Sequence, residues 1–160
     1  MRASRVKDFL DTNHIHYNTI IHPTSYTAQG TAAYAHVSGN EMAKTVMVKL
    51  DNQLAMAVLP ASYQIDLSAL KRLTKSKSVC LASESEFEMK FPDCDLGAMP
   101  PFGNLYGVPV FVEERLKEDR DIAFNAGTHN ELMRMRYDDF ERVVNPIVGR
   151  FSLRPIPANA

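Results

Sequence analysis

The sequence predicts an α+β fold in which a mainly antiparallel, barrel-like mixed sheet is accompanied by interspersed helices. About seven short apolar runs, rich in β-branched residues and joined by tight turns, indicate the strands. Three or four helical patterns fall among these runs at irregular intervals. A doubly wound parallel sheet would require strict alternation of strands and helices, which this chain lacks.

The N-terminal quarter is predicted to hold a helix, a strand and a second helix. The first helix is expected from Ser4, a capping residue, to about Thr12, because its apolar residues recur at helical spacing. The run from His14 to His22 has the composition of a strand, and Pro23 ends it. A second helix is expected near residues 27–37, where small residues would let it lie close to a sheet.

The middle of the chain carries the strongest local signals. Lys44 to Leu50 and Gln53 to Leu59 are strand-like runs, and the Asp51-Asn52 pair between them suits a tight hairpin turn. Asp66 is placed to cap a short helix, and Ser83 with Glu86 matches a capping box. The remaining elements are expected as strands at Val79 to Ala82, Val108 to Val112 and Ile122 to Ala126, and as a helix at Tyr137 to Val144.

Length and composition favour one domain over residues 1–160, with residues 146–160 as a loosely packed tail. A net charge of −1 argues against a protein that coats nucleic acid through a general excess of positive charge. A local basic patch stays open, because four cations lie between Lys71 and Lys77. No apolar run approaches the ~18 residues of a membrane span, and the N-terminus lacks a signal-peptide core, so a cytoplasmic protein is expected.

Few residues have the spacing of reactive or metal-binding groups. Cys80 and Cys94 have neither disulfide nor zinc spacing, and Cys94 as a nucleophile is the weaker alternative to an incidental thiol. His14 and His16 share one face of a strand but lack further ligands, so no metal is expected. Serine-hydrolase elbows, phosphate-cradling loops and dinucleotide fingerprints are all absent.

A stiff loop from Gly97 to Gly103 is the most informative stretch. Glycines at its ends leave the backbone free, and the adjacent prolines Pro100 and Pro101 fix φ in its middle, so neither a helix nor a central strand can pass through it. The loop is either an ordinary connection or the wall of a binding site. Lys44, at the start of an apolar strand, would need an anionic partner unless it reaches water, and His129 lies in a turn that could present it to a pocket.

Three short motifs, taken together, resemble the YbaK/prolyl-tRNA synthetase-associated domain family. They are Ala-Lys-Thr-Val-Met-Val at Ala43 to Val48, Gly-Ala-Met-Pro-Pro at Gly97 to Pro101, and Ala-Gly-Thr-His at Ala126 to His129, the last followed by Met-Arg-Tyr-Asp-Asp-Phe. Their order and separations agree with the family over nearly the whole chain. The resemblance implies a free-standing deacylase that hydrolyses mischarged aminoacyl-tRNA in trans.

The resemblance also implies the site. Lys44 and His129 are the expected catalytic residues. The expected substrate-binding residues are Gly97, Ala98, Met99, Pro100, Pro101, Gly127 and Thr128. Glu114 and Asp121 are both candidates for an acidic residue that family members often carry, and no metal or other cofactor is implied.

The implied chemistry needs little from the protein, because an aminoacyl ester is already activated and requires mainly positioning of water and stabilisation of an oxyanion. Alanine, cysteine or serine, on tRNA-Pro or a related tRNA, are the expected cargoes, since pocket walls exclude large side chains better than small ones. Met99 and Phe102 are candidates to line that pocket. The expected partners are the aminoacyl-tRNA 3′ end and, as a second candidate, a synthetase, with neither DNA nor membrane. The alternative is a non-catalytic module that binds the aminoacyl-tRNA end or an amino acid and regulates a synthetase.

Overall fold

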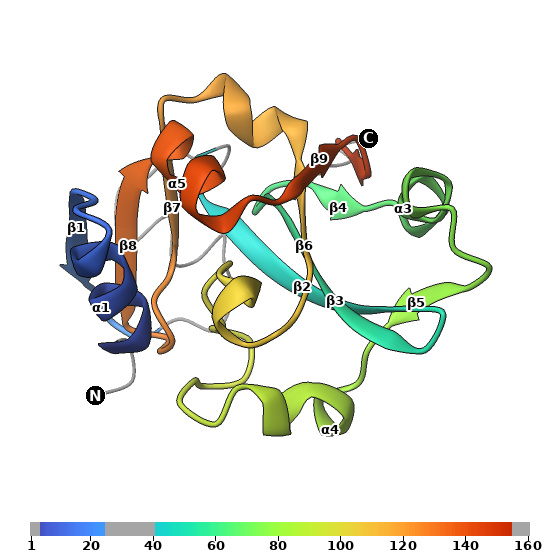
Figure 1. Ribbon diagram of the computed structural model, residues 1–160, viewed down its shortest axis with the longest axis horizontal. Helices are drawn as coiled ribbons and strands as arrows, with labels where there is room; N and C mark the ends of the chain where they lie inside the picture. The colour runs from blue at the N-terminus through green and yellow to red at the C-terminus, as the bar shows by residue number, and fades with distance from the viewer. Residues whose placement is uncertain (1–3, 25–40, 155–160) are drawn as a thin grey trace.

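A computed structural model describes residues 4–24 and 41–154 and has an α+β fold, as predicted (Figure 1). Its largest sheet has the strand order β5-β2-β3-β6-β9. These strands are β2 (Ala43–Leu50), β3 (Gln53–Pro60), β5 (Val79–Leu81), β6 (Val110–Glu113) and β9 (Ile147–Gly149). The β2–β3 hairpin is confirmed: Asp51 and Asn52 have φ of 49° and 70°, the positive pair that a type I′ turn requires.

A second, three-stranded antiparallel sheet has the order β1-β8-β7. Its strands are β1 (Tyr17–Ile21), β8 (Glu131–Arg136) and β7 (Asp121–Asn125). An isolated parallel bridge between Met42 and Ala123 joins the start of β2 to the middle of β7. Most strand pairs are antiparallel, whereas β3–β6 and β6–β9 are parallel, so the sheets are mixed as expected. Within the described residues the strands form separate sheets, so the barrel-like arrangement does not close.

Four α-helices are described, in the places that local signals predicted. They are α1 (Ser4–Thr12), α3 (Leu67–Thr74), α4 (Glu84–Phe87) and α5 (Tyr137–Val144). Asp66 caps α3 by accepting from the Ala69 N–H at 3.1 Å, and the Glu86 carboxylate accepts from the Ser83 N–H at 2.9 Å. Short 3₁₀ turns follow at η1 (Glu88–Lys90), η2 (Gly103–Leu105) and η3 (Glu114–Glu118). The helix predicted near residues 27–37 lies outside the described residues.

The strand predicted from His14 begins only at Tyr17. His14 has φ of 58° and its N–H bonds the Asp11 carbonyl at 3.1 Å, so these residues close a turn after α1 before the chain extends. The main apolar core is built from both larger sheets together with α1 and α5. A smaller cluster on the other face of the five-stranded sheet packs against α3. No helix in the described parts of the chain is both long and apolar enough to cross a membrane.

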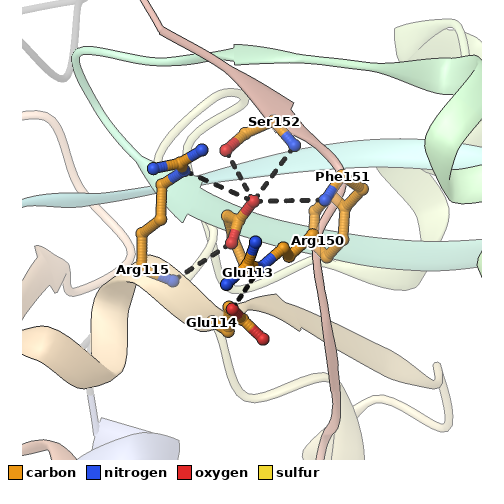
Figure 2. A network of polar contacts seen from close by, with 6 residues as sticks. All are labelled: Glu113, Glu114, Arg115, Arg150, Phe151 and Ser152. Atoms are coloured by element: carbon orange, nitrogen blue, oxygen red, sulfur yellow. Dashed lines mark hydrogen bonds and ion pairs between the residues drawn. The ribbon is translucent and has the colours of Figure 1, made fainter.

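The C-terminal segment is not a loose tail up to residue 154, which corrects the expectation for residues 146–160. β9 pairs with β6, and β10 (Ser152–Leu153) pairs with β4 (Gln64–Ile65). Phe151 is 1% exposed. Figure 2 shows the reason: the fully buried Glu113 carboxylate at the end of β6 accepts hydrogen bonds from the backbone N–H groups of Phe151 and Ser152 and from the Ser152 hydroxyl. Residues 155–160 lie outside the described part.

Candidate functional site

The stiff loop and the histidine turn, 30 residues apart in sequence, are joined through their backbones. The Asp95 N–H donates to the Gly127 carbonyl at 2.7 Å, and the Gly127 N–H donates to the Ala98 carbonyl at 3.0 Å. Gly127 has φ of 102°, in the region that favours glycine. The structure therefore brings two of the predicted site segments into direct contact.

His129 lies over the loop. Its Nε2 is 2.7 Å from the Leu96 carbonyl, and its ring occupies the space beside Gly97. A Cβ built on Gly97 would lie 3.4 Å from the ring carbon Cε1, and Gly97 has φ of 85°. Glycine adopts that φ without strain, whereas other residues rarely do. The contacts of His129 thus fix the shape of the loop.

The rest of the loop is buried. Ala98, Met99, Pro100 and Pro101 are all buried, and the Met99 sulfur accepts from the Gly97 N–H at 3.3 Å. Phe102, a candidate pocket residue, instead belongs to the main core, where its ring centroid lies 5.4 Å from that of Phe124 and 5.6 Å from that of Phe140. This placement corrects the expectation for Phe102, because the rings of Phe124 and Phe140, together with that of Phe9 at 6.1 Å, pack against it in the core.

Thr128, expected at the same site, faces the outer side of the turn. Its hydroxyl donates to the Asn130 side-chain oxygen at 2.8 Å, and both atoms are exposed. The bond stabilises the turn between β7 and β8. Its polar group is therefore already engaged in the structure.

Lys44 lies on β2, opposite Leu59 of β3, and is half-buried. No described residue forms an ion pair or hydrogen bond with its ammonium group. Burial lowers the pKa of Lys44 from its ordinary value, because desolvation disfavours the charged form. A half-buried ammonium without an anion beside it is the arrangement that an anionic or strongly polar ligand would complete.

Among the buried polar atoms without a hydrogen-bond partner in the described structure are one on Asn125 and one on His22, residues that the sequence did not single out. Asn125, at the end of β7, is 9% exposed, and its Oδ1 accepts no hydrogen bond. His22, directly after β1, is 6% exposed; its Nδ1 lies 2.7 Å from the Pro23 carbonyl, and its Nε2 has no partner. Since a carbonyl only accepts, Nδ1 is the donor and Nε2 of the neutral ring is an acceptor. Such orphaned groups are uncommon in proteins and require an explanation.

Strand register places Asn125 on the face of the three-stranded sheet that is turned away from the main core. Along each strand alternate side chains point to opposite faces, and Ile122 and Phe124 face the main core. Ala123 and Asn125 therefore face the other way, where Ala123 packs with Met42. Lys44 and Asn125 each lie two residues beyond the parallel Met42–Ala123 bridge, Lys44 on β2 of the five-stranded sheet and Asn125 on β7 of the three-stranded sheet.

The remaining candidates lie elsewhere. Glu114 pairs with Arg150, and Asp121, at the opposite end of β7 from the histidine turn, pairs with Arg134. Cys94 is buried, with its sulfur 3.4 Å from the Tyr106 hydroxyl, and desolvation raises the pKa of its thiol to about 11. A thiol with that pKa is a poor nucleophile near neutral pH. Within residues 4–24 and 41–154, no three His, Cys, Asp or Glu side chains form a metal-binding group.

Comparison with known proteins agrees with the resemblance seen in the sequence motifs. The family model described as "Aminoacyl-tRNA editing domain" matches residues 22–143. The multifunctional Ser/Thr-tRNA deacylase ProXp-y of Escherichia coli K12 is 33% identical over 101 residues, which cover 62% of this chain and 60% of that protein. The protein of the same name in Escherichia coli O157:H7 aligns equally well. The chain thus spans about three fifths of the length of these curated relatives.

Solved structures share the fold over almost the entire chain. The crystal structure of the hypothetical protein APE2540 superposes with a TM-score of 0.83 at 19% identity, covering 93% of this chain and 99% of that one. A candidate trans-editing enzyme for prolyl tRNA synthetase superposes with a TM-score of 0.82 at 18% identity, covering 95% of this chain and 97% of that one. At such identities these two structures show the fold alone.

Proposed function

Because the chain belongs to the aminoacyl-tRNA editing domain family, we propose that it is a deacylase that hydrolyses the ester of mischarged aminoacyl-tRNA in trans. One observation carries the proposal: the half-buried Lys44 ammonium and the partnerless Asn125 oxygen belong to residues that each lie two positions beyond the bridge joining β2 to β7. A cationic donor together with a neutral acceptor suits the end of a charged tRNA, which offers phosphate and ester oxygens beside an α-ammonium group.

The two residues have complementary roles in this proposal. The Lys44 ammonium binds an oxygen of the terminal nucleotide or of the developing oxyanion, where a partly desolvated cation acts more strongly than in water. Asn125 Oδ1 accepts a hydrogen bond from the α-ammonium of the aminoacyl group. His22 Nε2 is a second acceptor on this side of the sheet and is suited to orient a water molecule.

Hydrolysis needs no covalent intermediate on the protein. The oxygen of a water molecule bonds to the ester carbonyl carbon, and the bond from that carbon to the ribose oxygen breaks. The ribose oxygen leaves with a proton, and the amino acid departs as a carboxylate after its own proton passes to solvent. The protein contributes positioning and charge stabilisation, which is enough for an activated ester.

In this proposal the stiff loop that begins at Gly97 selects the amino acid by the size of its side chain. Hydrogen bonds from Asp95 and Gly127 and the His129 ring hold residues 95–98 in one conformation. A wall that cannot move excludes large side chains, whereas it rejects a slightly smaller one by only about 1–3 kcal/mol. We therefore propose alanine, cysteine, serine and threonine as candidate cargoes, the last two because the E. coli relatives are named as Ser/Thr-tRNA deacylases. His129 serves as a positioning residue for this wall.

The direct test is to incubate the pure protein with tRNA-Pro and related tRNAs mischarged with each of these four amino acids. Loss of the aminoacyl group from at least one tRNA, faster than in buffer, is expected. Each reaction is repeated with an added prolyl-tRNA synthetase to see whether that partner is needed. Tight binding without hydrolysis of any substrate would contradict the deacylase and favour a non-catalytic binding module.

A further inference from the structure

We propose that a cleft lined by Arg120 and Arg136 binds a phosphate of the acceptor strand of the tRNA, several nucleotides from the aminoacylated end. This inference rests on the proposed function for the identity of the RNA. It concerns a second contact site, at the far end of the three-stranded sheet, that neither the family match nor the sequence motifs assign.

The cleft has a volume of about 280 Å³ and is formed where β1, β7 and β8 meet. Arg120 immediately precedes β7. Arg136 is the last residue of β8 and lies opposite Asp121 in the register of the β7–β8 strand pair. His16 and Asn18 line the cleft from the side of β1. Polar and charged groups thus converge on one hollow from three segments that are distant in sequence.

Charge in the cleft is unbalanced. Three arginines and one aspartate line it, which leaves an excess of two positive charges in a chain whose net charge is −1. Arg134 is already paired, at 2.6 Å from Glu41 and 3.6 Å from Asp121. Arg120 and Arg136 form no ion pair with any described residue. Two guanidinium groups are therefore available to an anion.

The position of the cleft fits an extended polyanion. Asp121 and Asn125 lie on the same face of β7 and are four residues apart, so the cleft is roughly 13 Å from Asn125 at about 3.3 Å per residue. At about 3.4 Å of rise per nucleotide, that span corresponds to roughly four stacked nucleotides. An RNA whose 3′ end lies at Lys44 would place the phosphates near the start of its acceptor stem at the cleft.

Phosphate is the ligand class that the residues favour. The planar guanidinium group donates two parallel hydrogen bonds to a phosphate, and arginine binds such groups more specifically than lysine does. Met42, Ala61, Ala123 and Leu132 form a small buried apolar cluster between the cleft and Asn125. An acidic peptide is the competing ligand. Binding of such a peptide at the cleft would not require an RNA 3′ end to be bound at Lys44.

The test compares Arg120→Gln/Arg136→Gln with a matched control, Lys71→Gln/Arg72→Gln. The control removes two exposed cations from α3, which lies at the opposite end of the molecule from β7 and β8 (Figure 1). Binding of an uncharged RNA minihelix with a 3′ CCA end is measured by fluorescence anisotropy over a range of salt. Unchanged thermal unfolding of both variants establishes that they fold.

The cleft variant is expected to bind the minihelix about tenfold more weakly, and its slope of log Kd against log salt should fall by roughly 1, as expected for one lost phosphate contact. The control should bind like the wild type. Equal losses in both variants, or no loss in the cleft variant, would overturn the proposal. Preferential binding of an acidic peptide with no binding of the minihelix would also overturn it.

A second substrate separates this inference from the proposed function. An aminoacyl ester of adenosine alone is too short to reach the cleft, so the cleft variant should hydrolyse it at the wild-type rate while losing activity on the full aminoacyl minihelix. Equal loss on both substrates would contradict a distant phosphate site. If the wild type hydrolyses neither substrate, the deacylase proposal fails. The anisotropy measurement with the minihelix still tests whether the cleft binds a phosphate.

Discussion

Two sets of buried polar groups in the molecule differ in one respect. The Glu113 carboxylate is fully buried and accepts four hydrogen bonds, three of them from Phe151 and Ser152 and one from the Arg115 N–H. Lys44 is half-buried and Asn125 is buried, but the Lys44 ammonium and the Asn125 oxygen have no such partners. The comparison shows how a satisfied polar group, which holds the fold, differs from an unsatisfied one, which awaits a ligand.

The largest effect is expected from Glu113→Ala. Removing the carboxylate leaves buried donors on Phe151, Ser152 and Arg115 without acceptors, so the free energy of unfolding should fall by roughly 3–5 kcal/mol. Urea denaturation measures it. Ser152→Ala, which removes only the hydroxyl bond of 2.8 Å, serves as the matched control and should cost about 1 kcal/mol. An unchanged stability of Glu113→Ala would show that the carboxylate is not an anchor.

Gly97→Ala should strain the wall of the site. An alanine at φ of 85° costs roughly 1–2 kcal/mol, and its methyl group would lie in van der Waals contact with the His129 ring, 3.4 Å from Cε1. Gly107→Ala is the control, because Gly107 has φ of 70° with no atom within 4 Å of an added Cβ. Both variants should lose similar stability, whereas only Gly97→Ala should lose deacylation activity, by about tenfold. Equal deacylation activity in the two variants would show that the loop around Gly97 does not contribute to the site.

For Asn125→Ala the expected effects are the opposite of those for Glu113→Ala, with little change in stability and a loss of activity. Because the Asn125 oxygen has no partner, its removal relieves a desolvation cost that offsets the lost packing, so the free energy of unfolding should change by less than about 1 kcal/mol. Deacylation should still slow by about tenfold if the oxygen binds the α-ammonium. The measurement pairs urea denaturation with single-turnover hydrolysis. A large loss of stability at full activity would place Asn125 with Glu113 among the structural groups.

The pH dependence of RNA binding sharpens the assignment of Lys44. Burial lowers the pKa of Lys44, so its charged form is fully present below that pKa and is lost as pH rises through it, at a lower pH than for a free lysine near 10.4. Affinity for the uncharged minihelix should decline over the same range. Lys44→Arg stays charged and should show a flat profile at a somewhat weaker affinity. Parallel profiles for the two proteins would argue against a role for the ammonium.

Local signals carried most of the fold prediction. The Asp51-Asn52 turn, the Asp66 cap and the Ser83–Glu86 box each depend on residues within a few positions, and all three were confirmed. The C-terminal strands could not be predicted in this way. They depend on pairing with β6 and β4, far away in sequence, and on a buried carboxylate that accepts mainly from backbone N–H groups, which nearly every residue carries.

The candidate site was likewise predictable where it depends on local sequence motifs and not where it depends on long-range packing. The motif around Lys44 and the two glycine-containing loops identified segments, and the structure joins the loops through Gly127. Nothing in the sequence revealed that Asn125 and His22 are buried without partners, because burial is a property of the assembled sheet. An asparagine in the otherwise apolar run Ile-Ala-Phe-Asn was the one available signal.

The most direct measurement is the single-turnover rate of Lys44→Ala on the mischarged tRNA that the wild type hydrolyses fastest, taken beside its free energy of unfolding. Loss of an unpaired, half-buried ammonium should leave stability unchanged or raised, while the rate falls at least about 100-fold, the size of effect seen when one transition-state donor is removed. A rate near that of the wild type would contradict the account, whatever the stability of the variant.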